Sequence, residues 1–391
     1  MLKTILAFSF FVLGNYAYAS EQVFEDYIVN SMEFWEVPGA SIAVVKDNEI
    51  ILAKGFGHTT LEKRNEVNAD TLFQIASLTK SFTSVAAGIF SEQQQISLDS
   101  TVLSLWPSFE LPDAYATKHL TLRDCLSMRA GLVLPEFHWI WWLKPRLSQA
   151  NLLQILSNSS FPYDFRGCFA YENLLYNVVS CIIEKNTKET WEVFVQQQIL
   201  DELGMSSTTT NYRSFSASPN KAFPHEWRGC CVKQVPFPQL DIIAPAAGLS
   251  SNANDMAKWL QFLLDKQNSY SSVIKNTLTP QILPKTPMVF PEGEVWLEEV
   301  LFPRSHYITY GMGWFIHDYK GVIIFQNPGS TRGMNGLIAL VPELNLGIFI
   351  ASNLKAPFFN RSVLYHAIDH YLTEADDWNH IFLDVLKNSP K

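Results

Sequence analysis

Strand-like runs near both ends of the chain, with helical patterns between them, constrain the possible folds most strongly. Two apolar runs, residues 40–45 and 49–56, flank a polar turn and predict an early β-hairpin. Later apolar runs predict strands over residues 310–317, 322–326, 336–341 and 346–351. Helical periodicity predicts helices over residues 121–128, 148–157, 174–184, 191–203 and 252–265. We therefore expect an α+β protein whose antiparallel sheet is formed by both termini and flanked by helices, with a mostly helical subdomain inserted.

Chain length and charge limit the classes of protein that remain. The 391 residues are 47% apolar and 17% charged, which is typical of a folded globular chain with a large core. The net charge of −9 argues against nucleic acid as a main partner. We expect one domain over residues 20–391, with the sheet part at about 20–75 and 306–375 and the helical part at about 76–305.

Residues 1–19 have the pattern of an export signal. Lys3 supplies the positive start, Ile5 to Leu13 the apolar core, and Ala17-Tyr18-Ala19 a small-x-small cleavage site. That core is too short to anchor the chain in a bilayer, and no later stretch reaches spanning length. We expect a secreted or periplasmic protein without a transmembrane segment.

Ser77 and Lys80 form the first candidate catalytic pair. An apolar run leads to Ser77, and the pattern after it predicts a helix from Leu78 to Phe90. Residues three apart lie on one helix face, so the lysine can activate the serine as a nucleophile. Ser-x-x-Lys occurs four times, and Ser77 alone joins a buried approach to a long helical pattern. The alternative is a helix-capping serine beside a solvated lysine.

Tyr171-Glu172-Asn173 is the second segment whose side chains are suited to catalysis. In extended backbone, residues two apart face the same way, so Tyr171 and Asn173 can enter one site while Glu172 points elsewhere. A tyrosine can move protons, and an amide can hold both a lysine and a substrate carbonyl. The alternative is a tyrosine in an ordinary turn.

Cysteines and aromatic residues give weaker signals. The five cysteines cannot all pair, and neighbouring Cys230 and Cys231 are an awkward pair for a disulfide. Cysteine and histidine show no metal-ligand spacing, so we expect no metal and no organic cofactor. The aromatic cluster at residues 137–143 is either core or an apolar rim of a substrate pocket.

Taken together, five segments resemble the serine β-lactamase and penicillin-binding-protein superfamily. They are most similar to its branch of class C β-lactamases, D-stereospecific carboxypeptidases and β-lactamase-like esterases. The resemblance runs from about residue 25 to 373 and implies a β-lactamase/transpeptidase-like fold. The segments are Phe73-Gln74-Ile75-Ala76-Ser77-Leu78-Thr79-Lys80, Tyr171-Glu172-Asn173, Pro245-Ala246-Ala247-Gly248-Leu249, Tyr310-Gly311-Met312-Gly313-Trp314 and Gly329-Ser330-Thr331-Arg332-Gly333.

The resemblance implies a role for each site residue. Ser77 would attack a carbonyl, Lys80 would act as or support the general base, and Tyr171 would relay the proton to the leaving group. Asn173 would bind Lys80 and the substrate amide. An N–H of Ser77 and one from an edge strand, here Ser330, would stabilise the oxyanion.

The third motif of the superfamily is altered in this chain. Where the superfamily has Lys-Thr-Gly or a His-x-Gly variant, this chain has Asn327-Pro328-Gly329. We expect Asn327, Gly329 and Ser330 to line the substrate site, but Asn327 brings no positive charge to it. Arg332 is a candidate to restore that charge, and a solvated loop arginine is the alternative.

The sequence thus predicts an exported serine hydrolase that forms an acyl-enzyme on Ser77. Its partner would be a small-molecule, peptide or ester substrate, and the lost cation favours an ester or amide without a carboxylate. Esterase and D-amino-acid peptidase activities are both compatible with this prediction. The alternatives are a β-lactamase with a varied third motif and a non-catalytic penicillin-binding-like sensor.

Overall fold

The computed structural model describes residues 22–62, 65–133, 148–284, 307–373 and 376–388. The predicted export signal at residues 1–19 and the aromatic cluster at residues 137–143 lie outside the described residues.

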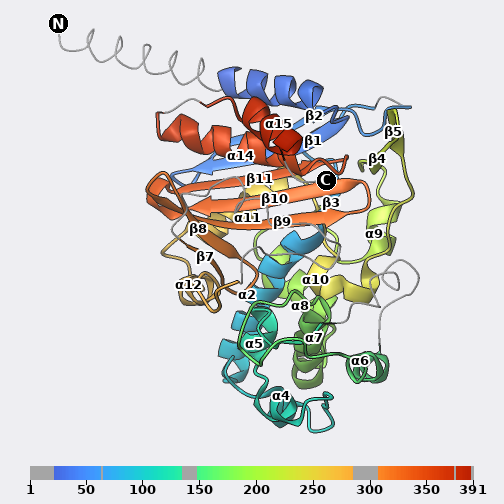
Figure 1. Ribbon diagram of the computed structural model, residues 1–391, viewed down its shortest axis with the longest axis vertical. Coiled ribbons are helices and arrows are strands. Elements are labelled where there is room, and N and C mark those ends of the chain that lie inside the picture. Colours follow the sequence, from blue (N-terminus) through green and yellow to red (C-terminus); the bar gives the residue numbers. More distant parts are fainter. Residues whose placement is uncertain (1–21, 63–64, 134–147, 285–306, 374–375, 389–391) are drawn as a thin grey trace, which may run out of the picture.

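A seven-stranded antiparallel sheet is built from both ends of the chain. Its strand order is β2-β1-β11-β10-β9-β8-β7, so the early hairpin joins the late strands through the pairing of β1 with β11. Figure 1 shows the strands near the two termini side by side in this sheet. The predicted α+β architecture is therefore confirmed. The strands are β1 Gly39–Lys46, β2 Glu49–Gly57, β7 Ile308–Tyr310, β8 Phe315–Tyr319, β9 Val322–Thr331, β10 Met334–Val341 and β11 Leu346–Ser352.

Two details of the late strands differ from the sequence prediction. The single strand predicted over residues 310–317 is a hairpin of β7 and β8, because Gly313 adopts φ +85° and turns the chain. A Cβ on Gly313 would lie 3.0 Å from the Lys80 carbonyl oxygen, so this turn packs directly on the start of α2. Strand β9 continues past the predicted end at residue 326 to Thr331, since it pairs with β10 along that length.

Each face of the sheet covers a hydrophobic core, as the alternation of side chains requires. On β1, Ile42 and Val44 belong to one core and Ala43 and Val45 to the other. A helix over residues 22–34, α14 (Pro357–Tyr371) and α15 (Trp378–Asn388) cover the first face. Helices α2 (Thr79–Gln94) and α11 (Ala253–Leu264) pack on the second face, which leads into the helical part drawn below the sheet in Figure 1.

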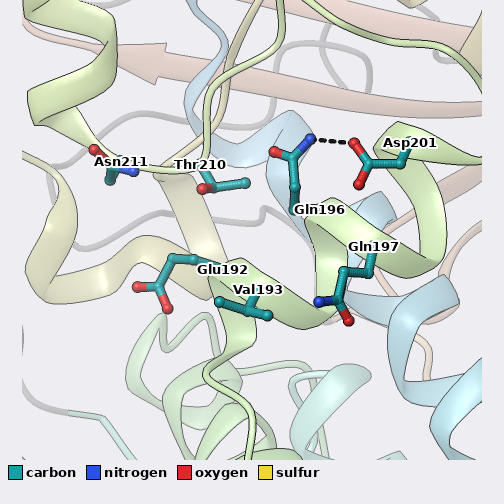
Figure 2. Close-up of a pocket in the computed structure, with 7 residues that line it drawn as sticks. All are labelled: Glu192, Val193, Gln196, Gln197, Asp201, Thr210 and Asn211. Carbon is teal, nitrogen blue, oxygen red and sulfur yellow. Dashed lines mark hydrogen bonds between the residues drawn. The ribbon is translucent and has the colours of Figure 1, made fainter.

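The helical part consists mostly of short helices. Residues 191–203, predicted as one helix, form α8 followed by a π-helical turn at Gln196–Asp201. An open hollow of about 410 Å³ lies beside this turn, where Gln196 Nε2 donates to Asp201 Oδ1 at 2.6 Å (Figure 2). The remaining helices are α3 Val102–Leu105, α4 Ala114–His119, α5 Leu122–Leu126, α6 Gln149–Leu156, α7 Leu174–Thr187, α8 Trp191–Val195, α9 Tyr212–Ala217, α10 Ala244–Ala247 and α12 Ser271–Thr277.

Two small two-stranded sheets complete the described structure. One pairs β3 (Phe73–Gln74) with β6 (Ser250–Ser251) and so holds the approach to Ser77. The other pairs β4 (His225–Arg228) with β5 (Cys231–Gln234). Among the described helices, none is both long enough and apolar enough to cross a membrane.

Candidate active site

Ser77 lies in a 3-10 turn, Ala76–Leu78, between β3 and α2. The backbone enters this turn tied to β6, because Ile75 N donates to Leu249 O at 3.1 Å. Ala76 then adopts φ +48°, a left-handed conformation that costs a non-glycine residue about 1 kcal/mol. Ser77 is partly exposed, although the residues on either side of it in the sequence are buried. A nucleophile needs this exposure because a substrate must reach it.

Lys80, Ser77 and Tyr171 form a hydrogen-bonded triangle. Lys80 Nζ donates to Ser77 Oγ at 2.9 Å and to Tyr171 OH at 2.7 Å. The two hydroxyl oxygens of Ser77 and Tyr171 lie 2.7 Å apart. Lys80 is fully buried, and its Nζ also donates to the carbonyl oxygen of Ala246 at 3.1 Å. The structure thus brings the three predicted catalytic side chains within proton-transfer distance of one another.

The other three Ser-x-x-Lys matches have different surroundings. Lys221 Nζ donates to the main-chain carbonyl of Ser218, and Ser272 Oγ donates to Glu92. Ser352 Oγ donates to the carbonyl oxygen of Leu354. In the Ser77 pair, the Tyr171 hydroxyl lies within hydrogen-bond distance of both the serine oxygen and the lysine nitrogen.

Tyr171 is delivered by the loop that precedes α7. Ala170 N donates to Met128 O at 2.8 Å, which ties this loop to the end of α5. The Glu172 carboxylate turns back and accepts from Leu174 N at 3.0 Å, where it satisfies a free N–H at the start of α7. Glu172 therefore points away from the triangle, as the alternation of side chains predicts.

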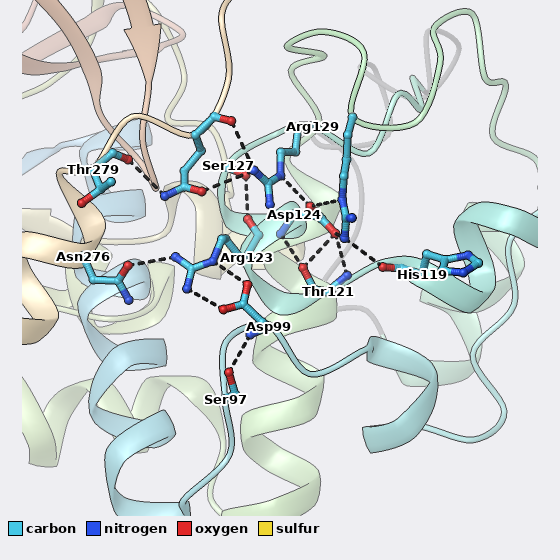
Figure 3. Close-up of polar contacts among 12 residues, drawn as sticks. Ser97, Asp99, His119, Thr121, Arg123, Asp124, Ser127, Arg129, Asn276 and Thr279 are labelled. Atoms are coloured by element: carbon cyan, nitrogen blue, oxygen red, sulfur yellow. Dashed lines mark hydrogen bonds and ion pairs between the residues drawn. The ribbon is translucent and has the colours of Figure 1, made fainter.

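A buried aspartate, Asp124, anchors the same loop and was not singled out from the sequence. Its carboxylate accepts from Arg129 Nε at 2.5 Å and from Arg166 Nη2 at 2.7 Å (Figure 3). It also accepts from the N–H and hydroxyl of Thr121 in a capping box at the start of α5. Burial alone would raise the pKa of Asp124, but the hydrogen bonds from Arg166, Thr121 and Arg129 together lower it. The sequence signal available was Thr121-x-x-Asp124, which is typical of a capped helix start.

Asn173 takes a different place from the one expected. It is 4% exposed, and its Oδ1 has no hydrogen-bond partner within the described residues. The expected contact of this oxygen with Lys80 is therefore not formed, and the Ala246 carbonyl accepts from Lys80 instead. This oxygen is enclosed by the surrounding protein, where an acceptor without a partner is costly.

The end of β9 forms the opposite wall of the site. Asn327 Nδ2 donates to the carbonyl oxygen of Ser77 at 2.8 Å. A Cβ on Gly329 would lie 2.4 Å from Ile75 O and 3.2 Å from Ser77 N, so β9 approaches the nucleophile as closely as glycine allows. Ser330 follows and is exposed. The contacts of these residues with a substrate stay predictions.

Strand β9 is not the edge strand that the resemblance implied. It lies between β10 and β8, but the pairing with β8 ends at Phe315 and Gln326. Residues 327–331 thus extend beyond β8 and pair on one side only, with β10. Donation from the Ser330 N–H to a substrate oxyanion stays a prediction.

Arg332 does not point its charge at the triangle. Its Nε pairs with Glu226 Oε1 on β4 at 3.5 Å, and Arg228 pairs with the other oxygen of Glu226 at 2.7 Å. Within the described residues, no group of three or more His, Cys, Asp or Glu side chains is placed to hold a metal ion.

Comparisons with known proteins identify the family and the fold of this chain. The family model described as Beta-lactamase matches residues 24–373. Protein flp of Staphylococcus aureus (strain MW2) is 23% identical over 353 residues, which cover 88% of this chain and 65% of that protein. The unguisins hydrolase ungD' of Aspergillus campestris is 27% identical over 390 residues, covering 93% of this chain and 68% of that protein.

A solved structure shows the same fold. The octameric penicillin-binding protein homologue from Pyrococcus abyssi superposes with a TM-score of 0.76, covering 93% of this chain and 80% of that one. At 22% sequence identity, this similarity speaks for the fold alone.

Proposed function

The chain belongs to the Beta-lactamase family, and from that membership we propose that it is an exported serine hydrolase acting through an acyl-enzyme on Ser77. The observation that carries the catalytic proposal is the triangle of Ser77, Lys80 and Tyr171, with all three contacts between 2.7 and 2.9 Å. Export rests on the signal-like pattern of residues 1–19.

In the first step, Ser77 Oγ attacks the carbonyl carbon of the substrate, and its proton passes to the deprotonated member of the Lys80–Tyr171 pair, which is either the Lys80 amine or the Tyr171 phenolate. The carbonyl oxygen becomes an oxyanion, which the backbone N–H groups of Ser77 and Ser330 are proposed to stabilise. Collapse of this intermediate expels the leaving group, which takes its proton through Tyr171. Water then attacks the Ser77 ester by the reverse proton path, which releases the acid and restores the serine.

We propose an ester or an amide without a carboxylate beside the scissile bond as the substrate. Two observations support this class: Asn327 is neutral and already bonded to the Ser77 carbonyl, and Arg332 is paired with Glu226. The name of the fungal relative describes that protein as a hydrolase, which agrees with turnover rather than binding alone.

Covalent labelling tests the nucleophile. We expect a fluorophosphonate or a fluorescent penicillin to label the protein, and Ser77→Ala to abolish the label. Ser272→Ala is the matched control, because Ser272 also precedes a lysine by three residues but bonds to Glu92. A label that persists on the Ser77→Ala variant would overturn the assignment.

A substrate panel tests the class. We expect turnover of a p-nitrophenyl ester to exceed that of a D-Ala-D-Ala peptide and of a chromogenic β-lactam. Faster β-lactam turnover would favour the β-lactamase alternative, and labelling without any turnover would favour the sensor.

A further inference from the structure

Two adjacent cysteines occupy the turn of the β4–β5 hairpin. Gly229 and Cys230 connect Arg228 on β4 to Cys231 on β5. Cys230 is exposed and Cys231 is partly exposed, and their Sγ atoms lie 3.8 Å apart without a disulfide. The other three cysteines are buried and belong to the protein core: Cys125, Cys168 and Cys181.

We propose that Cys230 and Cys231 are a thiol–disulfide exchange site that closes to a disulfide between neighbouring residues. The thiolate of one cysteine attacks a small-molecule disulfide, forms a mixed disulfide and releases one thiol of that molecule. The second cysteine then attacks the mixed disulfide, which forms the Cys230–Cys231 bond and releases the other small thiol. The small disulfide is reduced to two thiols, and the two protein thiols are oxidised.

The position of the two sulfurs favours this second step over retention of the mixed disulfide. The two Sγ atoms lie 3.8 Å apart, so the second thiol is present at a high effective concentration around the mixed disulfide. Its attack therefore outcompetes attack by a thiol of another molecule. The turn is also open to adjustment, since Gly229 has φ +69° and no atom within 4 Å of the place of a Cβ.

The resulting bond should be easily reduced. Cα atoms of adjacent residues lie about 3.8 Å apart, whereas disulfides usually span about 4.4–6.8 Å between Cα atoms. Closure therefore distorts the turn, and a distorted, exposed disulfide has a more oxidising potential than a structural one. The geometry is that of a reversible site rather than a permanent cross-link.

Closure would act on residues next to the proposed active site. Cys231 pairs with Arg228 in the hairpin register, and Arg228 shares Glu226 with Arg332. Arg332 follows Ser330 by two residues, so the hairpin contacts the turn after the proposed oxyanion donor. The exchange chemistry itself does not depend on the proposed function.

An aromatic disulfide, 5,5′-dithiobis(2-nitrobenzoate), provides the test on the native full chain. We expect each chain to release two thionitrobenzoate ions, keep no adduct and lose about 2 Da, with reduction by dithiothreitol restoring the mass. Cys230→Ser and Cys231→Ser should each release one ion and keep one adduct. The buried cysteines should stay unmodified, which provides an internal control.

Tryptic cleavage after Arg228 and Lys233 isolates both sulfurs in one short peptide, residues 229–233. The oxidised peptide should resist alkylation until it is reduced. Retained adducts on the unmodified sequence would overturn the proposal. Two copies of this peptide joined to each other would also overturn it, because they would show a bond between molecules.

Discussion

At the residue scale, Asn327 and Gly329 explain how an altered third motif still fits the site. Asn327 is 3% exposed and donates to the Ser77 carbonyl, so a neutral amide holds the nucleophile turn without the desolvation cost of a buried ammonium. Gly329 lets β9 reach the same turn, because a side chain there would meet Ile75 O at 2.4 Å. The two residues together fix the distance between β9 and Ser77.

Replacement of Gly329 should therefore be much more harmful than replacement of its neighbour in the sheet. We expect Gly329→Ala to lower kcat/KM for an ester by about 100-fold, since displacement of β9 misplaces the reacting groups. Gly336→Ala, directly across from Gly329, is the matched control. Its Cβ would meet Leu78 Cδ1 at 3.2 Å, which a small side-chain movement relieves. Equal losses in the two variants would contradict this account.

At the element scale, a buried ion network joins α5 to the loop that delivers Tyr171. Asp124 is fully buried and holds Arg129 from the end of α5 and Arg166 from the Tyr171 loop. Arg166 itself adopts φ +60°, a conformation that its two bonds to Asp124 help to hold. The network positions Tyr171 without contacting the reacting groups.

Asp124→Asn should lower the free energy of unfolding by about 3 kcal/mol at neutral pH, because two arginines lose a buried partner charge. The folded state lowers the pKa of Asp124, so its contribution is complete above the unfolded value of about 3.9 and is lost as pH falls through the folded value. The difference between the two proteins should therefore shrink in acid. Urea unfolding at several pH values measures it.

Asp99→Asn is the control for this prediction. Asp99 also pairs with an arginine, Arg123, but its side chain is 61% exposed (Figure 3). Exposed ion pairs contribute at most about 1 kcal/mol, so this variant should lose far less stability. A loss as large as that of Asp124→Asn would argue against burial as the cause.

At the scale of the whole molecule, the candidate active site lies where the helical part meets the sheet. Ser77 comes from the 3-10 turn before α2, Lys80 from the first turn of α2, Tyr171 from the loop before α7, and Asn327 from β9. The sheet itself is closed by the pairing of β1 with β11, which joins the two ends of the chain. The site therefore depends on a sheet that neither terminus can form alone.

Hydrogen exchange should show this dependence as a single cooperative unit. We expect the amides of β1, β10 and β11 to exchange last and with protection free energies within about 1 kcal/mol of one another. The edge strand β2, which has more exposed residues, should exchange earlier. Native-state exchange read by mass spectrometry measures both. Early exchange of β1 alone would show that the halves of the sheet open separately.

Local patterns in the sequence were sufficient for the early hairpin, most late strands, the long helix after Ser77 and the candidate pair of Ser77 and Lys80. Alternating and helical periodicity predicted the early hairpin, the late strands and the long helix after Ser77, because burial of one face leaves a regular pattern. The three-residue spacing of Ser77 and Lys80 fixes their proximity once that helix forms. The resemblance of several segments to a known superfamily predicted Tyr171 as their partner.

Tertiary structure decided the contacts between distant segments. The sequence did not indicate that Asn327 would bond to Ser77, that Ala246 would accept from Lys80, or that Arg332 would turn to Glu226. Local periodicity indicates which face of a helix or strand is buried. It does not indicate which distant residue packs against that face. Those contacts depend on how the sheet and the helical part pack, and this packing brings Lys80, Tyr171 and Asn327 to Ser77.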